Sequence, residues 1–127
     1  MAAINKNDVV AFSMPGGEVS AVAKAKTRPI DLAHLSRQTM GDRELEREVL
    51  DLFVDQAITI RDQFGSIGVN ERRLMAHSLK GSARSVGAMT IAEWAETVEE
   101  NPDDRHGLKR LSGLIDDVRD FIAAISR

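Results

Sequence analysis

The stretch Ala76-His77-Ser78-Leu79-Lys80-Gly81-Ser82-Ala83-Arg84 determines how the rest of the chain is interpreted. At about 100° per residue, an α-helix through this stretch has two unlike faces. One face is aliphatic, with Ser82 at its edge, and consists of Met75, Ala76, Leu79, Ala83 and Val86. The opposite face is polar and consists of Arg73, His77, Lys80, Gly81 and Arg84. The spacing therefore predicts a helix that buries its aliphatic face and presents the His77 imidazole to solvent, surrounded by positive charge.

Three further segments have apolar residues at the three- and four-residue spacing of amphipathic helices. The segment at about 42–65 has a stripe of Leu45, Val49, Leu52, Phe53, Gln56, Ile60 and Phe64. The segment after Gly87 is expected to face inward with Ile91, Ala92, Trp94, Ala95 and Val98. The last segment has the most regular stripe, made of Leu108, Leu111, Leu114, Ile115, Val118, Phe121, Ile122 and Ile125. We expect all of these stripes to face one shared core.

Capping residues predict where the helices begin and end. The expected N-caps are Asp31, Asp42, Asn70 and either Asp103 or Asp104, and the expected ends are Gly87 and Asn101-Pro102. Asp31 would begin a short helix that reaches about Met40, with Ile30 and Leu35 as its hydrophobic staple. Short loops favour antiparallel neighbours. The sequence therefore predicts an all-α fold, an antiparallel up-down-up-down four-helix bundle with an additional short N-terminal helix across one end.

Composition and charge restrict the possible classes of protein. The chain has 127 residues, of which 43% are apolar and 29% charged, as is typical of one soluble globular domain. Cys is absent, which excludes disulfides and zinc–thiolate sites. Residues 1–29 carry four Lys or Arg against two Asp or Glu, and we expect them to form a flexible or weakly ordered arm before a domain at residues 30–127. No apolar run could span a bilayer and no secretory signal is recognisable, so a cytoplasmic location is expected.

Metal binding and DNA binding are both disfavoured. A di-metal bundle would need Glu-x-x-His on two helices, and the sequence has none. Asp31-x-x-His34 and Asp103-x-x-His106 have this spacing, but their Asp residues are explained as helix caps. In a helix-turn-helix the segment after Gly87 would enter the major groove, yet its charged residues are all acidic, namely Glu93, Glu96, Glu99 and Glu100. The net charge of −3 does not mark the chain as a nucleic-acid binder either. Taken together, these observations lead us to expect no metal, nucleic-acid or membrane partner.

The polar face around His77 favours a phosphoryl carrier. An exposed imidazole is nucleophilic near neutrality, because its unperturbed pKa is about 6.5. Lys80 lies one turn further on and can hold the negative charge of a phosphoryl group. Gly81 costs about 0.5–1 kcal/mol relative to Ala inside a helix, which indicates that another surface approaches closely there. No glycine-rich nucleotide loop is present, so we expect a carrier without ATP-dependent kinase activity.

For three further residues near His77 the sequence allows two roles each. Leu74 lies roughly 60° from His77 on the helix and belongs either to an apolar docking patch or to a partly buried contact with a neighbouring helix. Arg73 and Arg84 either steer acidic partner pockets or are ordinary solvated charges.

The run His77-Ser78-Leu79-Lys80-Gly81, continuing to Gly87-Ala88, resembles the signature of histidine-containing phosphotransfer (HPt) domains of bacterial two-component phosphorelays. The resemblance covers about residues 30–127 and includes Gly41-Asp42 before the long second helix. It implies that His77 is phosphorylated, that Lys80 supports the phosphoryl group and that Gly81 leaves room for the partner.

The resemblance also implies a function and partners. The chain would accept a phosphoryl group on His77 from a receiver-domain aspartyl phosphate and pass it to another receiver aspartate. Its partners would be response-regulator receiver domains and hybrid histidine kinases. The receiver would supply Mg²⁺, and the carrier itself would bind no cofactor. The carrier is expected to be a monomer. The main alternative is a non-catalytic helical adaptor that docks on an acidic partner protein.

Overall fold

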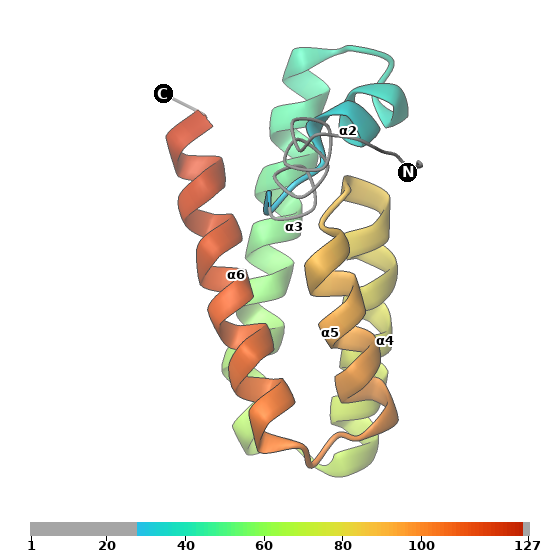
Figure 1. Ribbon diagram of the computed structural model, residues 1–127, viewed down its shortest axis with the longest axis vertical. Coiled ribbons are helices and arrows are strands. Elements are labelled where there is room, and N and C mark those ends of the chain that lie inside the picture. Colours follow the sequence, from blue (N-terminus) through green and yellow to red (C-terminus); the bar gives the residue numbers. More distant parts are fainter. Residues whose placement is uncertain (1–27, 126–127) are drawn as a thin grey trace, which may run out of the picture.

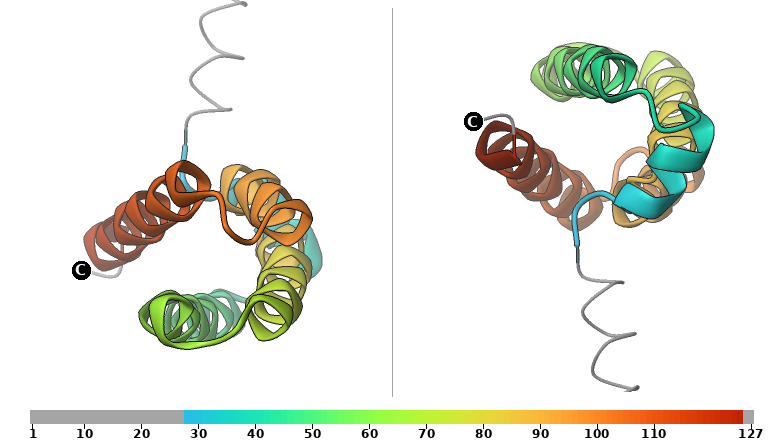
Figure 2. Two further views of the ribbon diagram at one scale, coloured as in Figure 1. Left: turned by 90° about the horizontal axis from the view of Figure 1, so that it is seen from below. Right: turned by 90° about the horizontal axis from the view of Figure 1, so that it is seen from above.

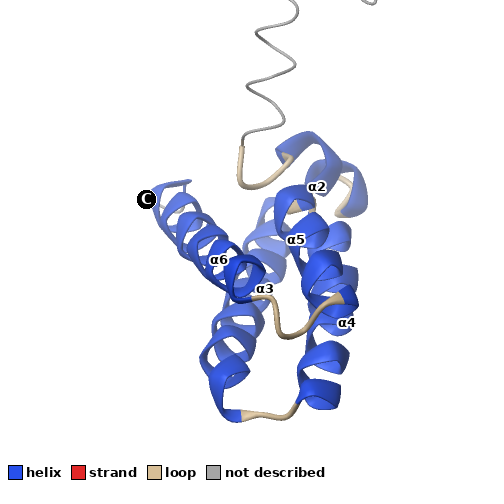
Figure 3. Cartoon of the chain, turned by 60° about the horizontal axis from the view of Figure 1, so that its bottom comes forward, coloured by secondary structure: helices blue, strands red, loops and turns tan. Residues whose placement is uncertain are grey.

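The computed structural model describes residues 28–125. The arm predicted at residues 1–29 therefore lies almost wholly outside the described residues. The elements are α2 Leu32–Gln38, α3 Arg43–Gln63, the 3₁₀ turn η1 Phe64–Ser66, α4 Val69–Val86, α5 Met89–Glu100 and α6 Arg105–Ile125. Within residues 28–125 the chain consists of helices and connecting loops alone, so the predicted all-α class is confirmed (Figure 3).

The long helices surround one aliphatic core. The chain passes along α3, back along α4, and then along α5 and α6 in the same alternating manner (Figure 1). Seen end-on, these helices follow one another around the interior (Figure 2), and α3 and α5 each contact both α4 and α6. The short helix α2 lies at the end of the molecule where α4 stops and packs against α4 (Figure 1). None of the helices described in residues 28–125 is long and apolar enough to cross a lipid bilayer.

Most of the predicted helix boundaries are confirmed. The side chains of Asp31 and Asp42 accept hydrogen bonds from backbone N–H groups three residues later, each at 3.1 Å, and so cap α2 and α3. Ile30 and Leu35 are both buried, as the predicted staple requires. Gly87 ends α4 with a φ of 87°, in the left-handed region that favours glycine.

Gly87 also ties α2 to the end of α4. Its carbonyl accepts a hydrogen bond of 2.9 Å from the Asp31 N–H. A Cβ at Gly87 would lie 2.8 Å from the Asp31 carbonyl oxygen, so only glycine fits this approach. The α4–α5 turn is therefore held by the first residues of the described chain.

The predicted start of α4 and part of the predicted core are wrong. Helix α4 begins at Val69 with Gly68 as its N-cap rather than Asn70, because the Glu71 side chain reaches back to accept from the Gly68 N–H at 3.5 Å. On α3 the buried positions are Leu50, Phe53, Ala57 and Ile60, with Phe64 in η1. Several residues expected inside are exposed instead, namely Leu45, Leu52 and Ile125. Helix α3 is thus rotated so that the small side chain of Ala57 lies inside and Leu52 outside.

Arg72 fastens the loops at the end of the molecule opposite α2. Its guanidinium donates to the carbonyl oxygens of Phe64 at 2.9 Å, Ile67 at 3.1 Å and Pro102 at 2.8 Å. It also lies 3.3 Å from a carboxylate oxygen of Asp103, and only 13% of the side chain is exposed. One arginine therefore holds the α3–α4 connection and the α5–α6 connection together.

Candidate functional site

His77 stands on the exposed face of α4, as predicted. The buried residues Ala76, Leu79 and Ala83 fix the rotation of α4, because each has no exposed surface. The His77 side chain is 65% exposed. An imidazole in this position is accessible to another protein without any movement of the helices.

A single carboxylate, that of Glu99 on α5, binds both His77 and Lys80. Its Oε2 lies 2.8 Å from Nδ1 of His77, and its Oε1 lies 2.7 Å from Nζ of Lys80. The Glu99 side chain is 23% exposed and that of Lys80 is 16% exposed, so this ion pair is partly shielded from water. The predicted picture of His77 surrounded by positive charge is therefore wrong, since the charged group nearest to the ring is an acid.

The contact with Glu99 distinguishes the two ring nitrogens of His77. The Lys80 ammonium and then the His77 ring, through their hydrogen bonds, lower the pKa of the Glu99 carboxyl below its ordinary value. An ionised carboxylate only accepts hydrogen bonds, so Nδ1 of a neutral His77 carries the proton. The lone pair of the neutral ring is then on Nε2, the nitrogen that Glu99 does not occupy.

Gly81 leaves a gap in the surface one turn beyond His77. It is exposed, and a Cβ built at this position would meet no atom within 4 Å outside its immediate surroundings. No contact within the described residues therefore requires glycine here, although glycine weakens the interior of a helix.

Arg73 and Arg84 lie beside the site and contact α5. Nε of Arg73 donates to the Glu99 carbonyl oxygen at 3.1 Å. An Nη atom of Arg84 lies 3.3 Å from a carboxylate oxygen of Glu96, and this pair is about half exposed. Arg72, which adds to the positive charge of this segment, faces the loops instead. The acidic residues of α5 thus compensate much of the positive charge on α4.

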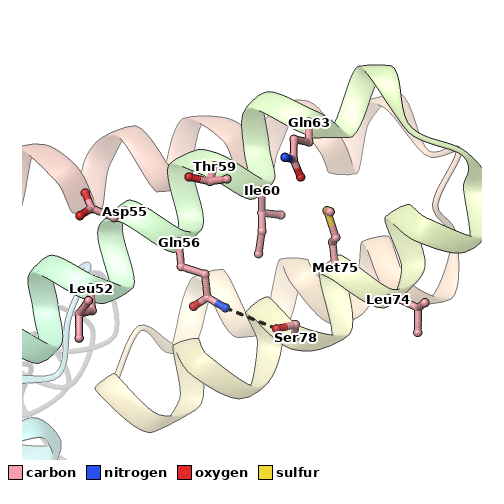
Figure 4. A pocket seen from close by; sticks show the side chains of 9 residues that line it. All are labelled: Leu52, Asp55, Gln56, Thr59, Ile60, Gln63, Leu74, Met75 and Ser78. Carbon is pink, nitrogen blue, oxygen red and sulfur yellow. Dashed lines mark hydrogen bonds between the residues drawn. The ribbon is translucent and has the colours of Figure 1, made fainter.

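Next to His77, an apolar groove lies between α3 and α4. Leu52 and Leu74 are each 70% exposed and line it from opposite helices. The groove has a volume of about 600 Å³, and its other lining residues are Asp55, Gln56, Thr59, Ile60, Gln63, Met75 and Ser78 (Figure 4). Leu74 is therefore not buried against a neighbouring helix, which leaves the docking-patch alternative.

A hydrogen bond crosses the groove beside the site. Nε2 of Gln56 donates to Oγ of Ser78 at 3.4 Å (Figure 4), and Ser78 directly follows His77 in α4. The groove is therefore lined by the residue that directly follows His77 in the chain.

The other two histidines have structural contacts. His34 Nε2 lies 3.2 Å from the Ser85 carbonyl oxygen, and the His106 ring packs edge-on to Trp94 with centroids 5.8 Å apart. Across residues 28–125, no cluster of three or more His, Cys, Asp or Glu side chains could hold a metal ion.

Glu99 is the site residue that sequence reasoning missed. The acidic residues of α5 served only as an argument against DNA binding. The sequence signal was charge complementarity, since residues 70–86 carry four Lys or Arg and one Glu, whereas the charged residues of the next helix are all acidic.

Comparison with known families identifies the family of this chain. The family model for the Hpt domain matches residues 42–126, a segment that contains all of α3, α4, α5 and α6 and every residue of the site. No curated protein matches, and no solved structure matches. Hpt domains are histidine phosphotransfer modules of phosphorelays, where they interact with receiver domains and histidine kinases. Because the match spans most of the sequence, the chain belongs to the Hpt domain family.

Proposed function

We propose that His77 accepts a phosphoryl group from the aspartyl phosphate of one receiver domain and passes it to the aspartate of another. The observation that carries this proposal is the exposed His77 ring, whose Nδ1 is hydrogen-bonded to Glu99 while its Nε2 has no hydrogen-bond partner among residues 28–125. The carrier does not use ATP and holds no cofactor, and the receiver supplies the Mg²⁺ that phosphoryl transfer requires.

The transfer is a displacement at phosphorus. The lone pair of Nε2 attacks the phosphorus atom, a nitrogen–phosphorus bond forms, and the bond from phosphorus to the receiver carboxylate breaks. The electron pair of that bond leaves with the carboxylate, and the ring keeps its proton on Nδ1. In the second transfer the same steps run in the opposite direction toward another aspartate.

The neighbouring residues position the reaction. Lys80 supplies positive charge to the phosphoryl oxygens, which matters most when a docked partner excludes water. Gly81 provides clearance for the receiver surface. Leu74, together with Leu52, forms the apolar docking surface in the groove, and Arg73 and Arg84 orient the acidic pocket of the receiver.

The same proposal covers the architecture. Residues 30–127 form the phosphotransfer domain, an antiparallel up-down-up-down four-helix bundle with α2 in addition. The path of the chain in Figure 1 supports this arrangement of the described helices. The domain acts as a monomer in the cytoplasm.

Intact-mass spectrometry after mixing with phosphorylated receiver domains tests the function. The wild-type chain should gain one phosphoryl group, and His77→Gln should gain none. His106→Gln is the matched control, because this histidine packs on Trp94 and should not affect labelling. A stable complex without covalent phosphate, equally strong in His77→Gln, would instead identify a non-catalytic adaptor.

A further inference from the structure

Glu99 already binds the Lys80 ammonium group, which a phosphoryl group on His77 would need as its counter-charge. In the unphosphorylated protein, one oxygen of Glu99 binds the Lys80 ammonium and the other binds Nδ1 of His77. A phosphoryl group on Nε2 carries roughly −1.5 to −2 charges, if it resembles other phosphorylated side chains. Lys80 would then lie between two anionic groups. The more closely the Lys80 ammonium interacts with the phosphoryl group, the weaker its ion pair with Glu99 becomes.

The other charges around His77 do not relieve this competition. Helix α4 supplies Arg73 and Arg84, and α5 supplies Glu96 in addition to Glu99. The side chain of Arg73 is bound to the Glu99 carbonyl, and Arg84 is paired with Glu96. On the α3 side, the uncharged Gln56 is hydrogen-bonded to Ser78, and the charged residue that lines the groove, Asp55, is an acid and adds no positive charge. Lys80 is thus the cation that directly joins the Glu99 carboxylate.

Glu99 also affects how the nitrogen–phosphorus bond breaks. When the bond breaks, its electron pair has to be accepted by Nε2. If Nδ1 carries a proton, the ring leaves as neutral imidazole, whereas without that proton it would have to leave as an imidazolate anion. A carboxylate that accepts the Nδ1 hydrogen bond favours the protonated ring. Both effects of Glu99 act in the same direction, toward loss of the phosphoryl group.

We propose that Glu99 is a positioning residue that shortens the time for which His77 holds its phosphoryl group, by competing for Lys80 and by keeping Nδ1 protonated. This inference rests on the proposed function and describes its regulation. The site is then built for rapid passage of the phosphoryl group rather than for storage.

The test compares Glu99→Gln with Glu96→Gln. Both substitutions remove one negative charge from α5 and keep a side chain of the same shape, but Glu96 contacts Arg84 rather than His77 or Lys80. Each protein is phosphorylated chemically with phosphoramidate, and tandem mass spectrometry quantifies the phosphoryl group on His77 as it is lost. We expect the half-life to be at least threefold longer in Glu99→Gln than in the wild type, and unchanged in Glu96→Gln.

A pH series separates this role from a merely structural one. The Nδ1 titration of phosphorylated His77, followed by NMR, should have a lower midpoint in Glu99→Gln than in the wild type, and the rate of loss should follow that midpoint. An equal or shorter half-life in Glu99→Gln, or an unmoved midpoint, would overturn the inference. Because the phosphoryl group is installed chemically, these outcomes do not depend on transfer from a receiver, whose failure would count against the proposed function alone.

Discussion

Nζ of Lys80 lies 2.7 Å from Oε1 of Glu99, across the contact between α4 and α5. A cation that the sequence presents on an exposed helix face is therefore already paired in the folded protein. This pairing holds the ammonium group beside the His77 ring, because the second oxygen of the same carboxylate binds that ring.

Replacing Lys80 by alanine should slow phosphoryl transfer by about tenfold. A hydrogen bond to a charged group contributes about 1.5–3 kcal/mol, and about 1.4 kcal/mol corresponds to a factor of ten in rate. Rapid-quench measurement of label transfer from a phosphorylated receiver gives the rate. Lys109→Ala, an exposed substitution on α6, is the control and should transfer normally. Equal rates in the two variants would exclude an electrostatic role for Lys80.

Replacing Gly81 by glutamine should abolish productive docking while leaving the fold intact. The added side chain enters open space in the free protein, and the substitution replaces a helix-weakening glycine. The free energy of unfolding should therefore stay the same or rise by up to about 1 kcal/mol. Gly113 on α6 is equally open, so Gly113→Gln should show a similar change in stability with normal transfer. If Gly81→Gln transferred like Gly113→Gln, the steric explanation would be wrong.

The Glu99 carboxyl should titrate at lower pH than an ordinary glutamate. Its pKa in the folded protein is lowered by Lys80 and then by His77, whereas in the unfolded chain the value is about 4.3. The stabilisation from the ionised form is therefore complete above that unfolded value and is lost as the pH falls through the lower folded value. NMR detection of the Glu99 side-chain carbon should show this midpoint, and Lys80→Ala should raise it.

Denaturation in acid checks the same linkage. Wild type should lose more stability than Glu99→Gln as the pH falls below about 4.3, since glutamine has no charge to lose. Parallel stability curves for the two proteins through this range would contradict the lowered pKa.

Replacing Leu74 by aspartate should weaken receiver docking more than the chemical step. Leu74 is 70% exposed on the groove, so the substitution adds a charge to the apolar surface without disturbing the core. We expect the receiver concentration for half-maximal transfer to rise by about tenfold, corresponding to about 1.4 kcal/mol of binding free energy. Met40→Asp, at an exposed residue between α2 and α3, should leave that concentration unchanged. An equal effect of both substitutions would indicate nonspecific charge repulsion.

Replacing Arg72 by alanine should lower the free energy of unfolding by about 2–3 kcal/mol. The guanidinium donates to carbonyl groups in two loops, and hydrogen bonds from charged groups contribute about 1.5–3 kcal/mol each but are not additive. Urea denaturation measures the change. Arg73→Ala, at the next residue, should lower stability by no more than about 1 kcal/mol, because its exposed side chain makes a single hydrogen bond, to the Glu99 carbonyl oxygen. A similarly small effect of Arg72→Ala would show that the loops hold together without it.

Local features of this chain could be predicted from sequence because their causes are local. Asp31 and Asp42 cap helices through contacts to residues only three positions away, and Gly87 adopts a backbone conformation that glycine favours. The face of α4 that carries His77 was also predicted correctly, since its small aliphatic residues define one stripe without ambiguity.

Features that depend on contacts between helices could not be predicted in the same way. The predicted rotation of α3 was wrong at Leu52, which is exposed. Two overlapping apolar stripes run along this helix, and only its packing against α4 and α6 determines which one is buried. Glu99 was missed because its partners lie 19 and 22 residues away in the sequence. Helical spacing relates residues within one element and gives no information on which side chains meet across two.

Part of the surface that would recognise a partner lies on a different helix from the groups that would react. His77, Lys80 and Glu99 lie on α4 and α5, which Gly87 joins, whereas α3 contributes Leu52 and the opposite wall of the groove. Mutation on the outer side of α3 can therefore change which proteins the domain engages without altering its reactive groups. Homologous domains could therefore evolve to bind different partner proteins while the reactive residues stay the same.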